Sequence, residues 1–345
     1  MVPVEELLTW TEGRLGRLRL NRPRAINSLT RAMIDRMDAT LTAWETDAEV
    51  VAVLLDGAGE RGLCSGADVR ALREGFLSGD PAAAEFLPTE FALNARVATY
   101  PKPYVAWMDG VVMGGGLGVS THGSLRLATP RATMAMPETI IGFFPDVGVT
   151  YQLGHAPGEL GTHLALTGLA VTGADAVHLG LADALVDPAV LDDLCSGLRQ
   201  GAVPSPAEIG DTAPDAPLVA ERGWIDECYA ATGASDATGL LDEARLILRR
   251  LRAHPSDAAR ETAAVLEQRS PLSVVVALVA VRQARTMSDV PEVLARDGRI
   301  GPPLIVGPDF IEGVRAQLVD KDRSPVWSLA SLDEVTPAHV SAIVG

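Results

Sequence analysis

The sequence predicts an α/β core followed by a mainly helical C-terminal region. Strand-like segments are followed by glycine-containing loops and then by helical patterns, and this order is typical of an α/β fold. Beyond about Asp187 the strand-like segments give way to a proline-rich passage and then to helical spacing. A chain of 345 residues can hold two unequal parts. We expect the core over residues 1–190 and the helical region over 191–345.

The first elements follow from hydrophobic spacing. Residues 14–23 alternate apolar and polar side chains and stop at a proline, which predicts a half-buried strand. Residues 30–44 place their apolar side chains on one face of a helix. The apolar run 50–57 predicts a strand that is covered on both faces. A short helix is expected over 67–75, and residues 76–88 read as a loose connection.

The same order recurs further along the chain. Residues 104–108 predict a strand, followed by a glycine-rich loop and a helix that begins near Gly116. Residues 124–128 predict another strand. In the C-terminal region, helical patterns cover 240–251, 257–266, 272–284 and 310–318.

Composition and charge limit the possible partners. The chain is 47% hydrophobic and 21% charged, as is ordinary for a globular protein, and its formal net charge is −16. This charge argues against nucleic acid and anionic membranes, which attract basic surfaces. The three cysteines and six histidines show no metal-ligand spacing. There is no secretory pattern at the start and no membrane-spanning apolar run. We therefore expect a cytoplasmic protein without a metal.

Two carboxylates stand in an otherwise apolar segment. In AMPETIIGFFPDVG, Glu138 and Asp146 are eight positions apart among isoleucine, phenylalanine and valine side chains. Acids are rarely buried unless they are paired or functional. Two carboxylates in a pocket wall are the usual equipment for general acid/base or nucleophilic chemistry.

Two glycine-containing loops each follow a strand and precede a helix. They are LCSGADV and the triplet Gly114–Gly115–Gly116. If the loops face each other, one backbone N–H from each can bind a single oxygen that carries developing negative charge. The alternative is that the glycines only permit tight strand-to-helix turns. The acidic segment nearby favours an enzyme that acts on a carbonyl.

The motifs resemble those of the crotonase (enoyl-CoA hydratase/isomerase) superfamily. SGAD, MDGVVMGGG and MPETIIGFFPDVG match in order, as does RPRAINSLTRAM, and the resemblance covers about Leu18 to Val186. It implies a crotonase-type spiral of repeated strand–strand–helix units. It also implies an oxyanion hole formed by Ala67 and Gly115. The residues that it implies for coenzyme A binding are Arg24, Ala25, Ser65, Asp68 and Val69.

Departures from ordinary hydratases point to one branch of that superfamily. A hydratase carries a catalytic glutamate at the position of Gly118, and it has glycine where this chain has Asp146. Retention of Glu138 together with Asp146 resembles the 3-hydroxyisobutyryl-CoA hydrolase branch. That branch has a substrate-contacting glutamate at the position of Glu90 in TEFALN. The segments SPLS and DFIEGVRAQLVDKDRSPVW also match it.

The resemblance implies hydrolysis of a short branched 3-hydroxyacyl-CoA, most simply 3-hydroxyisobutyryl-CoA of valine degradation. Glu138 and Asp146 would be catalytic, and both would contact the substrate together with Glu90 and Gly115. Glu138 would act as a nucleophile or activate water; the sequence leaves both open. No cofactor is implied, because coenzyme A arrives with the substrate. The alternatives are an enoyl-CoA hydratase or isomerase, and an inactive acyl-CoA-binding protein. The resemblance also implies a homo-oligomer, with trimers and hexamers common in the superfamily.

Overall fold

The structure, a computed structural model, describes residues 5–345 and groups the chain into two compact units. Unit 1 comprises Met1–Asp68, Pro88–Met134 and Val171–Ala216. Unit 2 comprises Val69–Leu87, Ala135–Ala170 and Pro217–Gly345. The predicted division into 1–190 and 191–345 cuts the chain once, whereas each of these units consists of three separate stretches. That division stays a prediction.

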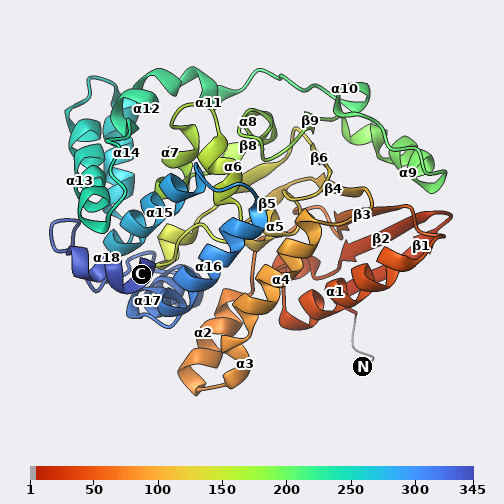
Figure 1. The fold of residues 1–345 in the computed structure, drawn as a ribbon, viewed down its shortest axis with the longest axis horizontal. Helices are drawn as coiled ribbons and strands as arrows, with labels where there is room; N and C mark the ends of the chain where they lie inside the picture. The colour runs from red at the N-terminus through yellow and green to blue at the C-terminus, as the bar shows by residue number, and fades with distance from the viewer. Residues whose placement is uncertain (1–4) are drawn as a thin grey trace. The chain divides into compact units, whose positions relative to one another are not determined.

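Unit 1 is built on a six-stranded sheet with the order β1-β2-β3-β4-β6-β9 (Figure 1). β1 and β2 are antiparallel, and the other neighbours are parallel. The strands are β1 (Leu7–Glu12), β2 (Leu15–Leu20), β3 (Ala52–Gly57), β4 (Tyr104–Met108), β6 (Leu125–Ala128) and β9 (Ala184–Leu185). The strands expected over 14–23, 50–57, 104–108 and 124–128 are confirmed as β2, β3, β4 and β6. The expectation that the first is half-buried is wrong: five of the six residues of β2 are buried. A three-stranded sheet has the order β5 (Val111–Met113), β7 (Thr133–Ala135), β8 (Val171–Thr172).

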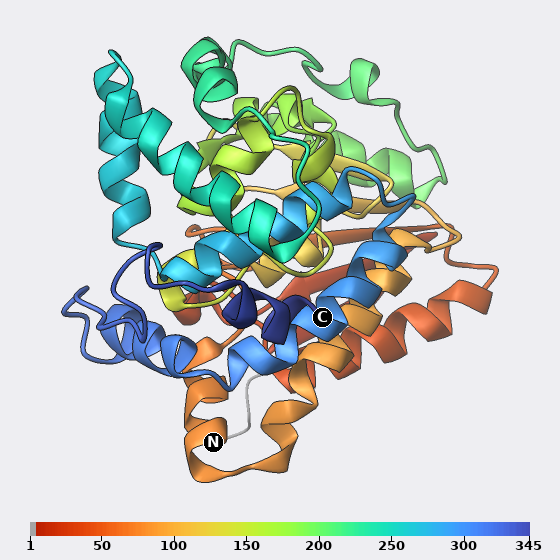
Figure 2. The same cartoon turned by 60° about the vertical axis from the view of Figure 1, so that its left-hand side comes forward.

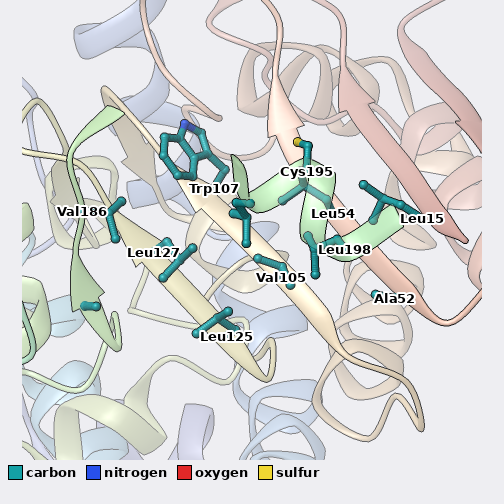
Figure 3. Close-up of a cluster of buried hydrophobic side chains, with 12 residues drawn as sticks. Leu15, Ala52, Leu54, Val105, Trp107, Leu125, Leu127, Val186, Cys195 and Leu198 are labelled. Carbon is teal, nitrogen blue, oxygen red and sulfur yellow. The ribbon is translucent and has the colours of Figure 1, made fainter. Parts of the chain in front are cut away.

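Helices cover both faces of the larger sheet. Successive residues of a strand point to opposite faces, so two neighbours on β2 show what covers each face. Gly16 of β2 faces α1 (Arg31–Thr46): a Cβ built on it would lie 2.7 Å from the Trp44 ring. Its neighbour Leu15 belongs to a buried cluster with Leu194 and Leu198 of α9 (Leu191–Arg199). Figure 3 shows Leu15 and Leu198 in this cluster. The other helices of the unit are η1 (Pro23–Ala25), most of α4 (Phe86–Ala98), α5 (Gly115–Gly118), α8 (Gly173–His178), η3 (Pro188–Val190) and α10 (Pro206–Ile209).

Unit 2 is helical. Its central helix α15 (Pro271–Ala284) is apolar on almost every side and is therefore buried, in contact with α6, α7, α13 and α18 (Figure 2). The other helices are α2 (Val69–Ser78), α3 (Pro81–Ala84), η2 (Glu138–Ile141), α6 (Thr150–His155), α7 (Leu160–Thr167), α11 (Pro217–Ala220), α12 (Arg222–Tyr229), α13 (Ala237–Ala253), α14 (Asp257–Glu267), α16 (Val290–Ile305), α17 (Pro308–Val314), a π-helical turn (Arg315–Val319) and α18 (Pro337–Val344).

The four predicted C-terminal helices are confirmed, and two local expectations are corrected. Residues 76–88 are not a loose connection: they contain the end of α2, all of α3 and the start of α4. α16 was missed because Pro302 and Pro303 lie inside it, and proline ordinarily ends a helix. Both prolines lie in the last turn, where the helix is about to end.

No single helix among residues 5–345 has the length and apolar composition to cross a membrane; α14 and α15 pass that test together but are bent by 114°. Among the same residues, no group of three or more histidine, cysteine, aspartate or glutamate side chains is arranged to hold a metal ion.

Candidate functional site

The two glycine-containing loops of unit 1 run side by side. Cys64 and Val112 form a parallel bridge, and Gly62 and Gly110 form an antiparallel one. The Met113 N–H donates to the Cys64 carbonyl at 2.9 Å, so the loops are joined by main-chain hydrogen bonds. The predicted pair of N–H donors requires that the two loops face each other. This condition is confirmed.

Glycine is needed in these loops because their backbones approach too closely for side chains. A Cβ atom built on Gly116 would lie 2.5 Å from the Cys64 carbonyl oxygen, and that oxygen belongs to a fixed backbone. Gly66 has a φ of +100°, which favours glycine, and its Cβ would lie 3.4 Å from the nitrogen of Gly115. The glycines therefore do more than permit a turn: they bring two main chains together.

Two backbone donors are left available where the loops meet. A Cβ built on Gly115 would lie 3.4 Å from the Ala67 nitrogen, so the two residues are neighbours. No acceptor among residues 5–345 takes a hydrogen bond from the N–H of either residue. Gly115 begins α5, where backbone N–H groups have no partner within the helix. Paired donors of this kind can stabilise an oxyanion. The assignment of Ala67 and Gly115 as that pair stays a prediction.

Glu90 of α4 lies directly against Gly115. Its Oε1 atom would lie 2.3 Å from a Cβ on Gly115, and the residue is 2% exposed. Burial raises the pKa of the Glu90 carboxyl to about 8. At neutral pH this carboxyl is therefore mostly protonated, and it can donate a hydrogen bond to a polar group placed at Gly115.

Asn94 was missed by the sequence analysis. It lies four residues after Glu90 on α4, which places both side chains on the same helix face. Asn94 is fully buried, and neither amide atom has a hydrogen-bond partner among residues 5–345. The spacing of glutamate and asparagine in TEFALN was the available signal, because two polar side chains on one face of a buried helix are unusual.

The two predicted catalytic acids belong to unit 2. Glu138 is 8% exposed and Asp146 is 5% exposed, which confirms that neither is an ordinary surface acid. Glu138 begins η2, and its carbonyl accepts a hydrogen bond from the Phe143 N–H at 2.9 Å. The next residue, Thr139, donates its hydroxyl to the Leu166 carbonyl at 3.2 Å. The turn that carries Glu138 is thus closed by its own hydrogen bond and anchored to Leu166 of α7.

The C-terminal motifs pack against this turn. A Cβ built on Gly142 would lie 2.3 Å from the Asp309 carbonyl carbon, and one on Gly313 would lie 2.5 Å from that of Ile141. Asp309 accepts hydrogen bonds from the Ser270 hydroxyl at 2.6 Å and from the Ser328 N–H at 2.7 Å. SPLS and the segment from Asp309 onwards therefore support the backbone that presents Glu138.

The residues predicted for coenzyme A binding belong to both units. Ser65 donates its hydroxyl to the Ala25 carbonyl at 3.2 Å, so Arg24, Ala25 and Ser65 come from adjacent segments of unit 1. Asp68 forms an ion pair with Arg22 at 3.0 Å. Val69, by contrast, begins α2 in unit 2. Their role in binding coenzyme A stays a prediction.

Two further residues bear on which chemistry is possible. Gly118 ends α5, which consists of three glycines and one leucine and therefore carries no carboxylate. Cys64 is fully buried; its thiol contacts the Asn27 carbonyl at 3.2 Å, and burial raises its pKa to about 12. A thiol that stays protonated is a poor nucleophile, which supports packing as its role.

Comparisons with known proteins agree with the motifs. Two curated relatives are named 3-hydroxyisobutyryl-CoA hydrolase, mitochondrial. The one from Xenopus tropicalis is 35% identical over 98% of this chain and 88% of its own length. The one from Bos taurus is 37% identical over 96% of this chain and 86% of its own length. Their names place them in mitochondria, whereas the cytoplasmic setting expected for this chain stays a prediction.

Solved structures share the whole fold. A carnitinyl-CoA dehydratase from Mycobacterium thermoresistibile has a TM-score of 0.91 at 43% identity, over 99% of this chain and 97% of that one. An enoyl-CoA hydratase from Rhodobacter sphaeroides has a TM-score of 0.90 at 35% identity, over 99% and 97%. The predicted crotonase-type fold is confirmed. Residues 15–344 match the enoyl-CoA hydratase/isomerase family model, and the chain belongs to that family.

Proposed function

We propose that the protein hydrolyses a short branched 3-hydroxyacyl-CoA thioester, with 3-hydroxyisobutyryl-CoA as the expected substrate. The observation that carries this proposal is the exchange of acids: Gly118 leaves α5 without a carboxylate, while Asp146 supplies a buried one in unit 2. The names of the curated relatives support the same reaction. Acyl-CoA is the substrate class of the family, and valine breakdown is the setting that we propose.

In the proposed reaction the N–H groups of Ala67 and Gly115 stabilise the negative charge that develops on the thioester oxygen. The Glu138 carboxylate either attacks C1 or takes a proton from the attacking water. In the first route the C–S bond breaks, coenzyme A leaves as a thiolate that takes up a proton, and water then cleaves the acyl–Glu138 anhydride. In the second route water adds directly. Both routes end in the free acid and coenzyme A.

The remaining polar groups would recognise the acyl part. Asp146 would accept the hydrogen bond of the substrate's 3-hydroxyl and orient Glu138 or the water. Glu90, whose carboxyl pKa is raised by burial to about 8, would fix the same end of the substrate from beside Gly115. No step needs a metal or a redox cofactor.

The second candidate is hydration of an enoyl-CoA, or the reverse dehydration. It is favoured by the names of two solved structures that share the fold, a carnitinyl-CoA dehydratase and an enoyl-CoA hydratase. Hydration ordinarily uses two acids to hold the water beside the double bond, and Gly118 removes one of them. A protein that only binds acyl-CoA is the third candidate.

One preparation distinguishes the three. Thiol release from 3-hydroxyisobutyryl-CoA and loss of enoyl absorbance from crotonyl-CoA are followed in parallel. We expect rapid thiol release and little loss of absorbance. Hydration of crotonyl-CoA without thiol release would establish the second candidate, and binding without either reaction would establish the third.

The role of Glu138 is tested in the same assay. Glu138→Gln keeps the size of the side chain and removes its charge. We expect turnover to fall at least about a hundredfold while substrate binding is kept, because general acid/base groups contribute about 10² to 10⁴ in rate. Near-normal turnover in a folded variant would exclude Glu138 as the reacting group.

A further inference from the structure

A buried ion pair in the C-terminal region takes no part in the proposed chemistry. Arg296 and Asp297 are neighbours on α16, and they are 2% and 0% exposed. Oδ1 of Asp297 accepts from Nη2 of Arg296 at 2.7 Å and from its Nε at 3.1 Å. Burying two charges carries a large desolvation cost, which is repaid only when every remaining polar atom finds a partner.

The remaining atoms of the pair bind the segment that carries Asp146. Oδ2 of Asp297 accepts a hydrogen bond from the Gly148 N–H at 3.0 Å. Nη2 of Arg296 donates to the Thr150 hydroxyl at 2.5 Å, and Nη1 donates to the Ala280 carbonyl of α15. The pair therefore ties residues 148 and 150 to α15 and α16, and all of these residues belong to unit 2.

The backbone between Asp146 and these contacts is strained. Val147 has a φ of +50°, and Gly148 has a φ of +77°. A left-handed conformation costs a residue with a side chain about 1–2 kcal/mol, and a β-branched residue is a clear outlier there. Such a conformation persists only where surrounding contacts impose it. The hydrogen bond that Asp297 accepts from the Gly148 N–H is such a contact, one residue after Val147.

A role in stability alone does not explain the pair. Apolar side chains of similar volume often stabilise a fold as well as a buried ion pair does, or better. What they cannot provide is a directed acceptor for one backbone N–H. In this chain that N–H lies two residues from Asp146.

We infer that Arg296 and Asp297 are positioning residues that hold the 147–150 backbone, including the strained Val147, and thereby fix the direction of the Asp146 carboxylate. This inference rests on the proposed function for the task of Asp146, which is to bind the substrate's 3-hydroxyl. The local part of it, that the pair orders residues 147–150, does not depend on the substrate.

The first experiment replaces the pair with apolar side chains, in the variant Arg296→Met/Asp297→Leu. We expect the unfolding temperature of this variant to lie within a few degrees of that of the wild type. The Gly148 amide should nevertheless exchange with deuterium faster than it does in the wild type. A matched control is Glu243→Gln, which alters another buried ion pair of unit 2, that of Arg282 and Glu243 at 2.7 Å. The control should leave exchange at Gly148 unchanged. Unchanged exchange in the apolar variant would overturn the inference, whatever the activity.

The second experiment uses activity. Thiol release is compared for 3-hydroxyisobutyryl-CoA and for isobutyryl-CoA, which lacks the hydroxyl. We expect Asp297→Asn, which keeps the size of the side chain, to lower kcat/KM at least tenfold for the first substrate and much less for the second. Glu243→Gln should change kcat/KM only slightly, and by the same factor for the two substrates. A displacement of about 1 Å can cost a hundredfold in rate, so this effect is measurable.

A double-mutant cycle separates positioning from an independent role. If Asp297 acts through Asp146, then Asp146→Ala/Asp297→Asn should be no slower than Asp146→Ala alone. Additive losses would overturn the inference and leave the hydrolase proposal standing. A wild-type protein that releases no thiol would refute the proposed function, and the exchange experiment would then still decide on the local role of the pair.

Discussion

At the scale of single residues, the space around Gly115 decides what this position can hold. A side chain there would collide with the Glu90 carboxyl and would also reach the Ala67 nitrogen. This one position thus limits two other groups of the proposed site, the Glu90 carboxyl and the Ala67 N–H. Glycine is needed for close approach here and not for a positive φ, because Gly115 begins a helix.

Gly115→Ala should lower hydrolysis by about 10² to 10³, the usual loss for one oxyanion donor, because the added methyl group displaces Glu90 or the loop. The measurement is thiol release under saturating substrate, with circular dichroism to confirm folding. Unchanged turnover in a folded variant would place the oxyanion site elsewhere in the chain.

Glu90 makes stability depend on pH. Its pKa is raised from 4.5 to about 8 by burial, so the folded chain keeps a proton that the unfolded chain releases. Its contribution to stability is therefore complete below pH 4.5 and is lost as the pH rises towards about 8. As the pH rises over this range, the unfolding temperature of Glu90→Gln should fall less steeply than that of the wild type. Parallel curves would contradict a buried, neutral Glu90.

At the scale of elements, α17 supports the η2 turn through backbone contact. Gly313 lies against Ile141 with no room for a methyl group, and Gly142 lies against Asp309 in the same way. The C-terminal motif that begins at Asp309 is far from Glu138 in sequence, but it packs against the turn that carries Glu138. The motif carries the residues that hold the turn in place.

Gly313→Ala should therefore destabilise the protein by about 1–3 kcal/mol, the usual cost of overpacking, and should lower activity. The matched control is Gly298→Ala in α16, whose added methyl group would meet no atom within 4 Å. That variant should be unchanged or about 1 kcal/mol more stable, because alanine favours helix over glycine. Chemical denaturation measures both. Equal effects would show that the contact with Ile141 is unimportant.

At the scale of the whole molecule, neither unit is a continuous piece of chain. Unit 1 needs residues 171–216, and α9 within them covers one face of the sheet. The predicted boundary near residue 190 separates α9 from that face. Leu194 and Leu198 would each contribute about 1.5–3 kcal/mol through burial, which is large beside a typical total of about 5–15 kcal/mol.

We expect the fragment 1–190 to lack cooperative unfolding and to bind a hydrophobic dye, because it exposes that face. Fragment 1–216, which restores α9, should bind less dye and show more strand signal by circular dichroism. Cooperative unfolding of 1–190 by itself would instead support a domain boundary at residue 190.

The sequence by itself determined the fold class, the main strands, the long C-terminal helices and the family, because hydrophobic spacing and contiguous motifs are local properties. It also identified Glu138 and Asp146 as buried acids, since charged side chains stand out in an apolar segment. Only the tertiary structure decided that the two glycine loops touch, that Glu90 meets Gly115, and that Arg296 and Asp297 bind the strained backbone after Asp146. Each of these contacts joins residues 25 to about 150 positions apart. Their spacing leaves no pattern along the chain, because the contacts depend on how separate segments pack.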